Sequence, residues 1–266
     1  MEIISQLSGI VVPVFICVAF GVLWAKVGTP FDTGLITSLV YNIGVPSLIL
    51  ATFQKVTLDA AAMAEIALAS LACYAAFTFL GFLLLRAMRL ETVAYLPALM
   101  FPLTGSMGLP VAYFAFGDQG LALAIVRIPV LYAVAIAVAM QLTGLRLPAW
   151  IFNTVDLLGG IVIPAQLVAL GFSLLQLRIG GLARSATLGV FRLAMGIAVG
   201  FAIAGIFGLD GAARAIVILQ SAMPVAVSSY LFAQKFNRRP EEVAGMVVVS
   251  TAVSFVTLPF LLLLVL

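Results

Sequence analysis

Gly108-Leu-Pro-Val-Ala112 in the first half of the chain returns in the second half as Ala222-Met-Pro-Val-Ala226. Proline interrupts a helix because it lacks an N–H group and because its ring clashes with the preceding turn. In a membrane, such an interruption persists only where the freed backbone groups meet protein, ions or water. The two copies therefore indicate two broken helices around a polar site.

The wider proline pattern supports an internal repeat. Four prolines are separated by 17, 16 and 64 residues in the first half and by 19, 16 and 60 residues in the second half. Shared spacing of this kind, together with the repeated motif, predicts an inverted repeat of five helices plus five. The prolines are Pro13, Pro30, Pro46 and Pro110, and then Pro129, Pro148, Pro164 and Pro224.

The composition is that of an all-α polytopic membrane protein. The chain of 266 residues is 64% hydrophobic and 9% charged, with a mean hydropathy of +1.27. One crossing of a bilayer needs about 20 apolar residues. Nine apolar runs meet this need, at residues 4–25, 35–53, 60–86, 92–116, 120–143, 151–176, 183–208, 212–234 and 243–266.

The first repeat is one crossing short. Only 18 residues separate Pro110 from Pro129, whereas 42 residues follow Pro224. We therefore predict a first repeat at 1–128 with a truncated fifth helix, and a second repeat at 129–266. With nine crossings, the loops on one side of the membrane would hold five Lys and Arg residues and those on the other side six. With ten crossings, the numbers would be eight and three. Because cytoplasmic loops carry the excess of positive charge, the sequence suits ten spans with both termini outside.

The interruptions supply the candidate binding residues. The stretch from Pro102 to Pro110 holds two glycines and two hydroxyls, and a half-helix starting near Leu109 would offer its positive end to an anion. An alternative is that these glycines only permit close helix packing. The candidate substrate-binding residues are Thr104, Gly105, Ser106, Gly108, Pro110, Gln220, Ser221, Pro224 and Ser228, with Asn42 and Gln166 beside Pro46 and Pro164.

Other polar residues carry less information. Arg192, within an apolar run, is a secondary candidate for contact with an anion or for snorkelling to the surface. Asp156 is expected near a helix start, in a capping or dipole role rather than in proton coupling. Histidine is absent, and Cys17 and Cys73 lie in apolar runs. Without a metal cluster, a nucleotide loop or a catalytic pair, the sequence predicts neither a cofactor nor an enzyme.

Four segments carry a family resemblance. They are Gly105-Ser-Met-Gly-Leu-Pro-Val-Ala-Tyr-Phe-Ala-Phe-Gly117, Ile163-Pro-Ala-Gln-Leu-Val-Ala-Leu-Gly-Phe-Ser-Leu174, Ser221-Ala-Met-Pro-Val-Ala-Val-Ser-Ser-Tyr230 and Val249-Ser-Thr-Ala-Val-Ser254. Together they resemble the auxin efflux carrier family, within the wider group of bile-acid, arsenite and riboflavin transporters. The chain departs from the family pattern at Leu103, Ser106 and Ser228, where asparagine is usual.

The resemblance implies that the helices form two domains with different roles. The first two helices of each repeat would form a scaffold and the others a transport domain with crossed broken helices, moving by alternating access. The substrates implied are small carboxylates, either auxin-like molecules or dicarboxylates. The implied scaffold segments are 1–58 and 129–180, and the implied transport segments are 59–128 and 181–266.

These observations favour a secondary transporter of small organic anions in the bacterial inner membrane. The expected partners are the anion and the lipid bilayer, without nucleic acid, and a homodimer is one possible assembly. Two alternatives stay open: a sodium-coupled symporter of the bile-acid type, and a truncated homologue that does not transport.

Overall fold

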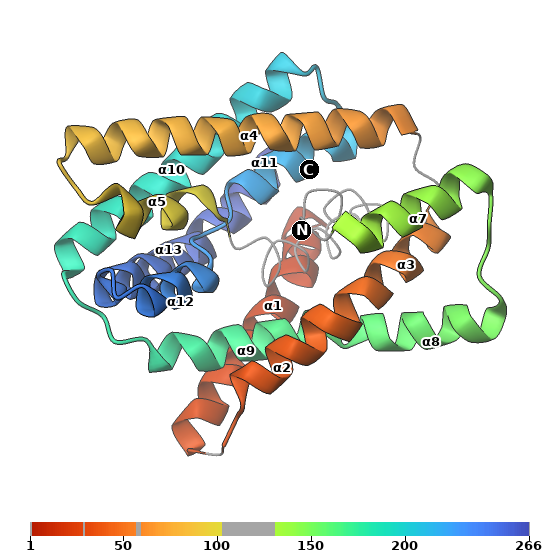
Figure 1. Cartoon of the computed structure of the whole chain (residues 1–266), viewed down its shortest axis with the longest axis horizontal. Helices are drawn as coiled ribbons and strands as arrows, with labels where there is room; N and C mark the ends of the chain where they lie inside the picture. Colours follow the sequence, from red (N-terminus) through yellow and green to blue (C-terminus); the bar gives the residue numbers. More distant parts are fainter. Residues whose placement is uncertain (1, 29, 57–59, 103–130, 266) are drawn as a thin grey trace. The chain divides into compact units, whose positions relative to one another are not determined.

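The computed structural model describes residues 2–28, 30–56, 60–102 and 131–265, and these residues are almost entirely helical (Figure 1). The only extended pairing among them is an isolated bridge between Pro102 and Val225. The helices are α1 (Glu2–Val27), α2 (Thr33–Leu39), the π-helical segment η1 (Val40–Gly44), α3 (Val45–Lys55), α4 (Ala60–Ala87), α5 (Thr92–Met100), α7 (Leu131–Thr143), α8 (Ala149–Gly160), α9 (Val162–Gln176), α10 (Leu182–Ile206), α11 (Gly211–Ser221), α12 (Val227–Lys235) and α13 (Pro240–Val265).

Several of these helices are suited to a bilayer. Within the described ranges, five stretches are long and apolar enough to cross a membrane: Thr33–Lys55, Ala61–Ala87, Ala149–Gln176, Leu182–Ile206 and Pro240–Val265. Large apolar side chains such as Leu157, Ile206 and Leu264 are more than 70% exposed, as expected of a surface that meets lipid. The all-helical, multi-span prediction is confirmed. The count of nine spans and the inverted repeat stay predictions.

The chain divides into two compact units, and each unit combines segments from both halves of the sequence. The first unit comprises Met1–Leu7, Leu68–Thr104 and Gln176–Leu266. The second unit comprises Ser8–Ala67 and Gly105–Leu175. Neither unit is therefore a continuous stretch of chain, and each is described below by itself.

In the second unit, glycines allow helices to approach closely. A Cβ atom on Gly159 in α8 would lie 2.8 Å from the Cα atom of Leu48 in α3, and one on Gly44 would lie 2.7 Å from a methyl group of Val162. Gly21 in α1 likewise faces the carbonyl oxygen of Val168 in α9. These distances leave no room for a side chain. Gly44 near Pro46 and Gly159 near Pro164 thus serve helix packing, whereas a Cβ atom on Gly160 would meet open space.

The helix around Pro46 is not unwound. Because proline cannot donate a hydrogen bond and its ring crowds the carbonyl four residues earlier, a regular α-helical turn is disfavoured there. The chain responds with the wider π-helical turn η1, which spans Val40–Gly44 directly before α3. Similarly, a turn at Ile161 separates α8 from α9 just ahead of Pro164.

The expectation for Asp156 is wrong. This residue lies well inside α8 rather than near its start, and its carboxylate forms an ion pair of 2.9 Å with the Nζ atom of Lys55 at the end of α3. Because α3 and α8 pack side by side, the charge of Asp156 is matched across the helix pair instead of by a helix terminus (Figure 1).

Most of the buried polar side chains among the described residues belong to the first unit. One of them, Ser70, lies on α4, and the others lie on α10, α11, α12 and α13, where α10 packs against both α11 and α13. Since a polar group inside an apolar unit is costly unless it is paired, such a concentration points to a site rather than to a simple core. The residues on α10 to α13 are Ser185, Arg192, Gln220, Ser221, Ser229, Ser250, Thr251 and Ser254.

Candidate functional site

The end of α5 meets the interruption between α11 and α12 in the first unit. Helix α5 ends at Met100 and continues as extended chain, while residues 222–226 separate α11 from α12. The N–H group of Ala226 donates to the carbonyl oxygen of Phe101 at 3.2 Å, and Pro102 pairs with Val225. Backbone groups freed by the interruption are thus partly satisfied by the chain that follows α5, as the interior of a membrane protein requires.

Helix α13 supports the same interruption. The hydroxyl oxygen of Ser250 accepts a hydrogen bond of 3.0 Å from the N–H group of Val225 and donates one of 3.2 Å to the carbonyl oxygen of Val247 in its own helix. Ser250 is fully buried. Its hydroxyl therefore replaces the helical partner that Val225 lacks.

Arg192 places a positive charge beside the end of α11. Its side chain is fully buried, and its Nη1 atom donates to the carbonyl oxygen of Ser221 at 3.2 Å. The guanidinium carbon lies 4.5 Å from the ring centroid of Phe77 in α4. A helix ends with unpaired carbonyl groups and a partial negative charge, so a cation is favourable at this position. Of the roles considered from sequence, the structure therefore favours an interior position over snorkelling.

Small residues bring α10 close enough for this contact. A Cβ atom on Gly196 would collide with the carbonyl oxygen of Ser221, and one on Gly200 would lie 3.0 Å from the Cα atom of Ile218. Helix α10 thus contacts the backbone of α11 directly, next to the interruption.

Two buried side chains beside this region have unused hydrogen-bonding atoms. Gln220, the residue before Ser221, is 1% exposed, and neither its amide oxygen nor its amide nitrogen has a partner in the part of the chain that the structure describes. The buried hydroxyl of Thr251 in α13 likewise has no hydrogen-bond partner among the described residues. An unpaired buried polar group costs about 1–3 kcal/mol, so these atoms are well suited to contact a ligand.

The predicted residues of α11, α12 and the segment between them all lie in the first unit. Ser221 is buried, and its hydroxyl donates to the Sγ atom of Cys73 at 3.5 Å. Pro224 is buried inside the interruption, and Ser228 is exposed in the first turn of α12. Ser229 next to it is buried and donates to the carbonyl oxygen of Pro97 at 3.4 Å.

The other predicted residues are not brought to this place by the structure. Asn42 is exposed in η1, and Gln166 is buried in α9 with both amide atoms unpaired among the described residues. Both belong to the second unit. The remaining candidates lie outside the described residues: Thr104, Gly105, Ser106, Gly108 and Pro110.

Sequence reasoning did not assign a role to Ser250 and Thr251. The available signal was a set of hydroxyl residues at positions 250, 251 and 254 in an otherwise apolar span. Polar side chains in such a span are expensive and usually face the protein interior, so the pattern predicts a buried polar stripe. It does not predict which backbone group the stripe would contact.

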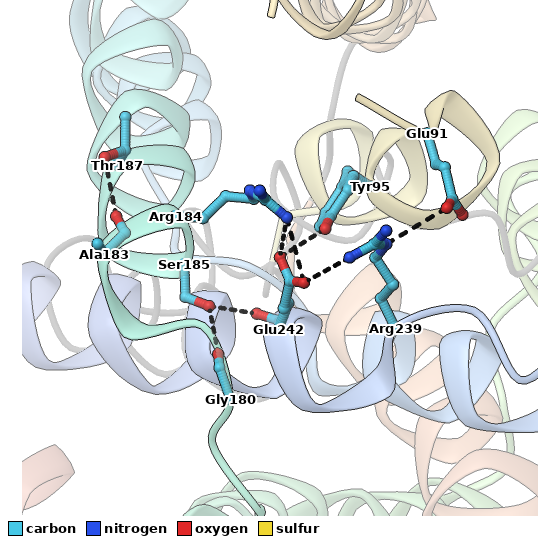
Figure 2. A network of polar contacts seen from close by, with 9 residues as sticks. All are labelled: Glu91, Tyr95, Gly180, Ala183, Arg184, Ser185, Thr187, Arg239 and Glu242. Carbon is cyan, nitrogen blue, oxygen red and sulfur yellow. Dashed lines mark hydrogen bonds and ion pairs between the residues drawn. The ribbon is translucent and has the colours of Figure 1, made fainter. Parts of the chain in front are cut away.

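A charged cluster holds the starts of α5, α10 and α13 together (Figure 2). Glu242 accepts a hydrogen bond of 2.6 Å from the hydroxyl of Tyr95 and pairs with Arg184 at 3.1 Å and with Arg239 at 2.9 Å. Arg239 also pairs with Glu91 at 3.3 Å. The hydrogen bond to Glu242, and to a smaller extent the one to Glu91, raises the pKa of Arg239 above its ordinary value, so this residue stays charged.

Backbone contacts tighten the same end of the unit. The hydroxyl of Ser185 donates to the carbonyl oxygens of Gly180 and Glu242, at 3.0 and 2.8 Å (Figure 2). Arg239 adopts a φ of 45°, in the left-handed region that few residues other than glycine favour. Its two ion pairs help to offset this conformational cost.

Comparison with known proteins identifies the family. Residues 119–262 match the family described as "Membrane transport protein", which covers the second half of the chain, including α10 to α12, the interruption and most of α13. A search of curated proteins found no match to the chain. The matched family is one of transporters, and it is the family that the interruption motifs resemble. The chain is therefore a multi-pass membrane protein that belongs to the auxin efflux carrier family of membrane transporters.

Proposed function

We propose that this protein is a secondary transporter that carries small organic anions across the bacterial inner membrane by alternating access. The observation that carries the proposal is the pairing of the end of α5 with the interruption between α11 and α12, beside a buried arginine. Extended backbone from Phe101 and Ala226 lies in one unit with the guanidinium of Arg192 and the unpaired amide of Gln220. Binding sites at discontinuous helices are the usual arrangement in transporters built from repeats.

The local charge supports an anionic substrate. Arg192 is a permanent cation in a buried position, and helix α12 begins directly after the interruption, where its first N–H groups lack helical partners. Both features lower the energy of a negative charge nearby. No acidic side chain is fully buried among the described residues of the first unit, and the partly exposed Glu242 is paired with Arg184 and Arg239.

The division into two units supports the alternating-access part of the proposal. The first unit contains the end of α5 and the interruption between α11 and α12, and the second unit is held by close glycine contacts between α1, α3, α8 and α9. We assign the moving role to the first unit and the scaffold role to the second.

A sodium-coupled symporter is the second candidate. The unpaired oxygens of Gln220 and Thr251 favour it, because amide and hydroxyl oxygens are ligands that hard cations accept. Transport driven by sodium would require the cation to bind together with the substrate.

Uptake by proteoliposomes tests both candidates. The full chain is reconstituted, and the uptake of radiolabelled phenylacetate, malate and malonate is compared with that of empty vesicles, in sodium and in choline. Saturable uptake of at least one anion, equal in both salts, is expected. Uptake that requires sodium would select the second candidate. No uptake of any anion by folded protein would overturn both and favour a homologue that does not transport.

A further inference from the structure

A groove of about 260 Å³ lies between α5 and α12 in the first unit. Its walls are apolar, and the one hydroxyl among its described lining residues, that of Ser229, already donates to the carbonyl oxygen of Pro97 at 3.4 Å. Two residues of the lining reach the surface, where Val93 is 74% exposed and Phe236 is 63% exposed. Because apolar side chains are unfavourable in contact with water, this opening suits contact with lipid acyl chains.

The turn after α12 fixes a cation at the rim of the groove. The N–H group of Arg238 donates to the carbonyl oxygen of Ala233 at 2.8 Å, and that of Asn237 donates to the carbonyl oxygen of Gln234 at 3.1 Å. Asn237 adopts a φ of 49°, in the left-handed region. These features form a Schellman motif, a common end of a helix. Ala233 and Arg238, which the motif joins, both line the groove, so the guanidinium extends from a fixed point beside the apolar walls.

The charge of Arg238 is available, unlike that of its neighbours. Arg184 and Arg239 are both paired with Glu242, and Arg239 also with Glu91. Arg238 is exposed and forms no ion pair within the described parts of the chain. The carboxylates nearest in these pairs are thus already matched, and Arg238 remains to bind an anion from outside the protein.

This end of the first unit is basic as a whole. The ion pairs of Glu91 and Glu242 bring together the segments 86–91, 178–184 and 235–242. These three segments contain seven Lys and Arg residues and three Glu residues. Basic clusters at the ends of membrane helices attract the headgroups of anionic lipids, so the charge of this surface is complementary to such a bilayer.

A stretch of acyl chain fits the groove. A water-sized group takes about 30 Å³, so the space holds about nine groups of the size of a methylene. The tail gains little from the hydrophobic effect, because other lipid tails offer it equally apolar surroundings. The choice between lipids therefore depends on the headgroup, and a guanidinium binds a phosphate through paired, charge-assisted hydrogen bonds.

We propose that this groove binds an anionic phospholipid of the surrounding bilayer, with part of an acyl chain between α5 and α12 and the phosphate on Arg238. The lipid is a partner that stays in the membrane, so the proposal goes beyond the transport reaction and leaves the transported anion at the interruption after α11. Phe101 lines the groove, and its carbonyl oxygen accepts the hydrogen bond from Ala226. A bound acyl chain thus packs against the segment that pairs with the interruption.

Native mass spectrometry of the full chain in detergent micelles tests the headgroup preference. Dioleoyl phosphatidylglycerol is compared with dioleoyl phosphatidylcholine, which has the same tails but a choline cation that Arg238 would repel. The first phosphatidylglycerol is expected to bind about tenfold more tightly. Arg238→Gln should remove most of this preference, and Arg238→Lys should keep most of it. The control is Arg214→Gln, at an exposed arginine of α11, which should leave the preference unchanged.

Photo-crosslinking tests the position of the lipid. Phosphatidylglycerol with a diazirine in its acyl chain should label peptides of α5 and α12. Ala233→Leu narrows the groove without a change of charge and should reduce this labelling at least fivefold. The Arg238 comparison does not depend on the folding of this variant, because Arg238 is exposed.

Four results would overturn the inference. They are equal affinity for the two lipids, an unchanged preference in Arg238→Gln, labelling confined to other helices, and loss of labelling on addition of a soluble anion. Loss with glycerol 3-phosphate would indicate a site for free phosphate, and loss with malonate would assign the groove to the transported anion. Uptake by proteoliposomes tests the proposed function separately, so either conclusion can fail while the other holds.

Discussion

Arg192 and Gln220 are both buried beside the interruption after α11, but they differ in their contacts with the rest of the protein. Arg192 contacts the carbonyl oxygen of Ser221 and the ring of Phe77. The amide of Gln220 contacts no hydrogen-bonding partner among the described residues. A polar group with protein partners contributes to the fold, whereas a buried group without them is free to contact a ligand. We therefore assign Arg192 to shaping the site and Gln220 to binding.

Arg192→Met tests the first assignment. Methionine has a similar length but no charge, so the carbonyl oxygen of Ser221 loses its donor. An unsatisfied buried group costs about 1–3 kcal/mol, and the free energy of unfolding should fall by this amount. Thermal unfolding in detergent measures the loss. Arg214→Met, at an exposed arginine, is the control. Equal stability of the two variants would show that the Arg192 contact does not hold the interruption.

Ser250→Ala tests how the interruption is fixed. The N–H group of Val225 would lose its acceptor, so we expect a loss of about 1–3 kcal/mol in the free energy of unfolding. Thr257→Ala is a matched control on the same helix, because the Thr257 hydroxyl bonds to the carbonyl oxygen of Ser254 in its own helix. If chemical denaturation gives the same free energy of unfolding for both variants, the Ser250 contact is not important for stability.

The sequence identified these residues to different degrees. Gln220, Ser221 and Pro224 could be predicted because they surround a proline inside an apolar run. Ser250 could not, since its partner lies 25 residues away and the contact depends on how α13 packs. Asp156 was misjudged for the same reason: its partner Lys55 is distant in sequence.

At the scale of helices, close approach and interruption occur together in the first unit. Helix α10 contacts the backbone of α11 at Gly196, one turn after Arg192 and next to the end of α11. Gly44 and Gly159 in the second unit also serve close packing, whereas the glycines between Pro102 and Pro110, for which packing was the alternative, lie outside the described residues. Interruption and packing are different uses of the same residue type.

Gly196→Ala should separate α10 from α11. Its Cβ atom would collide with a backbone carbonyl group, which cannot move aside as a flexible side chain can. We expect a loss of about 1–3 kcal/mol in the free energy of unfolding, typical of overpacking. Gly205→Ala, in the same helix with open space around its Cβ position, should be neutral or stabilising. Thermal unfolding measures both variants. A higher melting temperature for Gly196→Ala than for Gly205→Ala would contradict this packing.

Glu242→Gln should loosen the starts of α5, α10 and α13. The carboxylate has two arginine partners and one tyrosine partner, and the neutral amide weakens all three contacts. Because the cluster is a network and the Glu242 side chain is only 15% exposed, we expect the free energy of unfolding to fall by about 1–2 kcal/mol. Glu241→Gln is the control, since Glu241 is exposed and forms no ion pair among the described residues. A similar melting temperature for both variants would show that the cluster contributes little.

Sequence patterns predicted where helices occur more reliably than how they end. The apolar run at 35–53 was expected to be interrupted at Pro46, and the structure instead has a π-helical turn there. The run at 212–234 does contain an interruption, at residues 222–226. Proline disfavours a regular turn in both places, but Pro13, Pro97 and Pro259 lie inside continuous α-helices, so the surrounding packing decides whether the chain stays helical, widens or unwinds.

At the scale of the whole molecule, the chain forms two discontinuous units. Hydropathy and proline spacing detect helices and repeats along the sequence. They do not detect which helices gather into one unit, because that depends on contacts between helices that are distant in sequence, such as α5 with α12 and α13. Family resemblance, by contrast, could be found from a few short segments, and the match over residues 119–262 shows it.

Cysteine accessibility tests the orientation of the second repeat. Single cysteines at Ile179 and Asn237, in a chain whose Cys17 and Cys73 are replaced by alanine, lie in exposed turns that flank α10 and α13. Because the positive-inside pattern of ten spans places both turns in the cytoplasm, we expect labelling only after a membrane-impermeant maleimide reaches that side. Labelling from outside would mean that the second repeat is reversed and would contradict the mechanism.

The most direct test of the central claim is Gln220→Met, measured both for stability and for uptake. Methionine has the shape of glutamine without its polar atoms, and the protein offers those atoms no partner among the described residues, so thermal stability should be equal or higher. Gln234→Met, at an exposed position of α12, is the control. If the interruption after α11 is the anion site, uptake by Gln220→Met proteoliposomes should fall about tenfold at unchanged or raised stability. Uptake equal to that of the unaltered protein would show that the anion binds elsewhere.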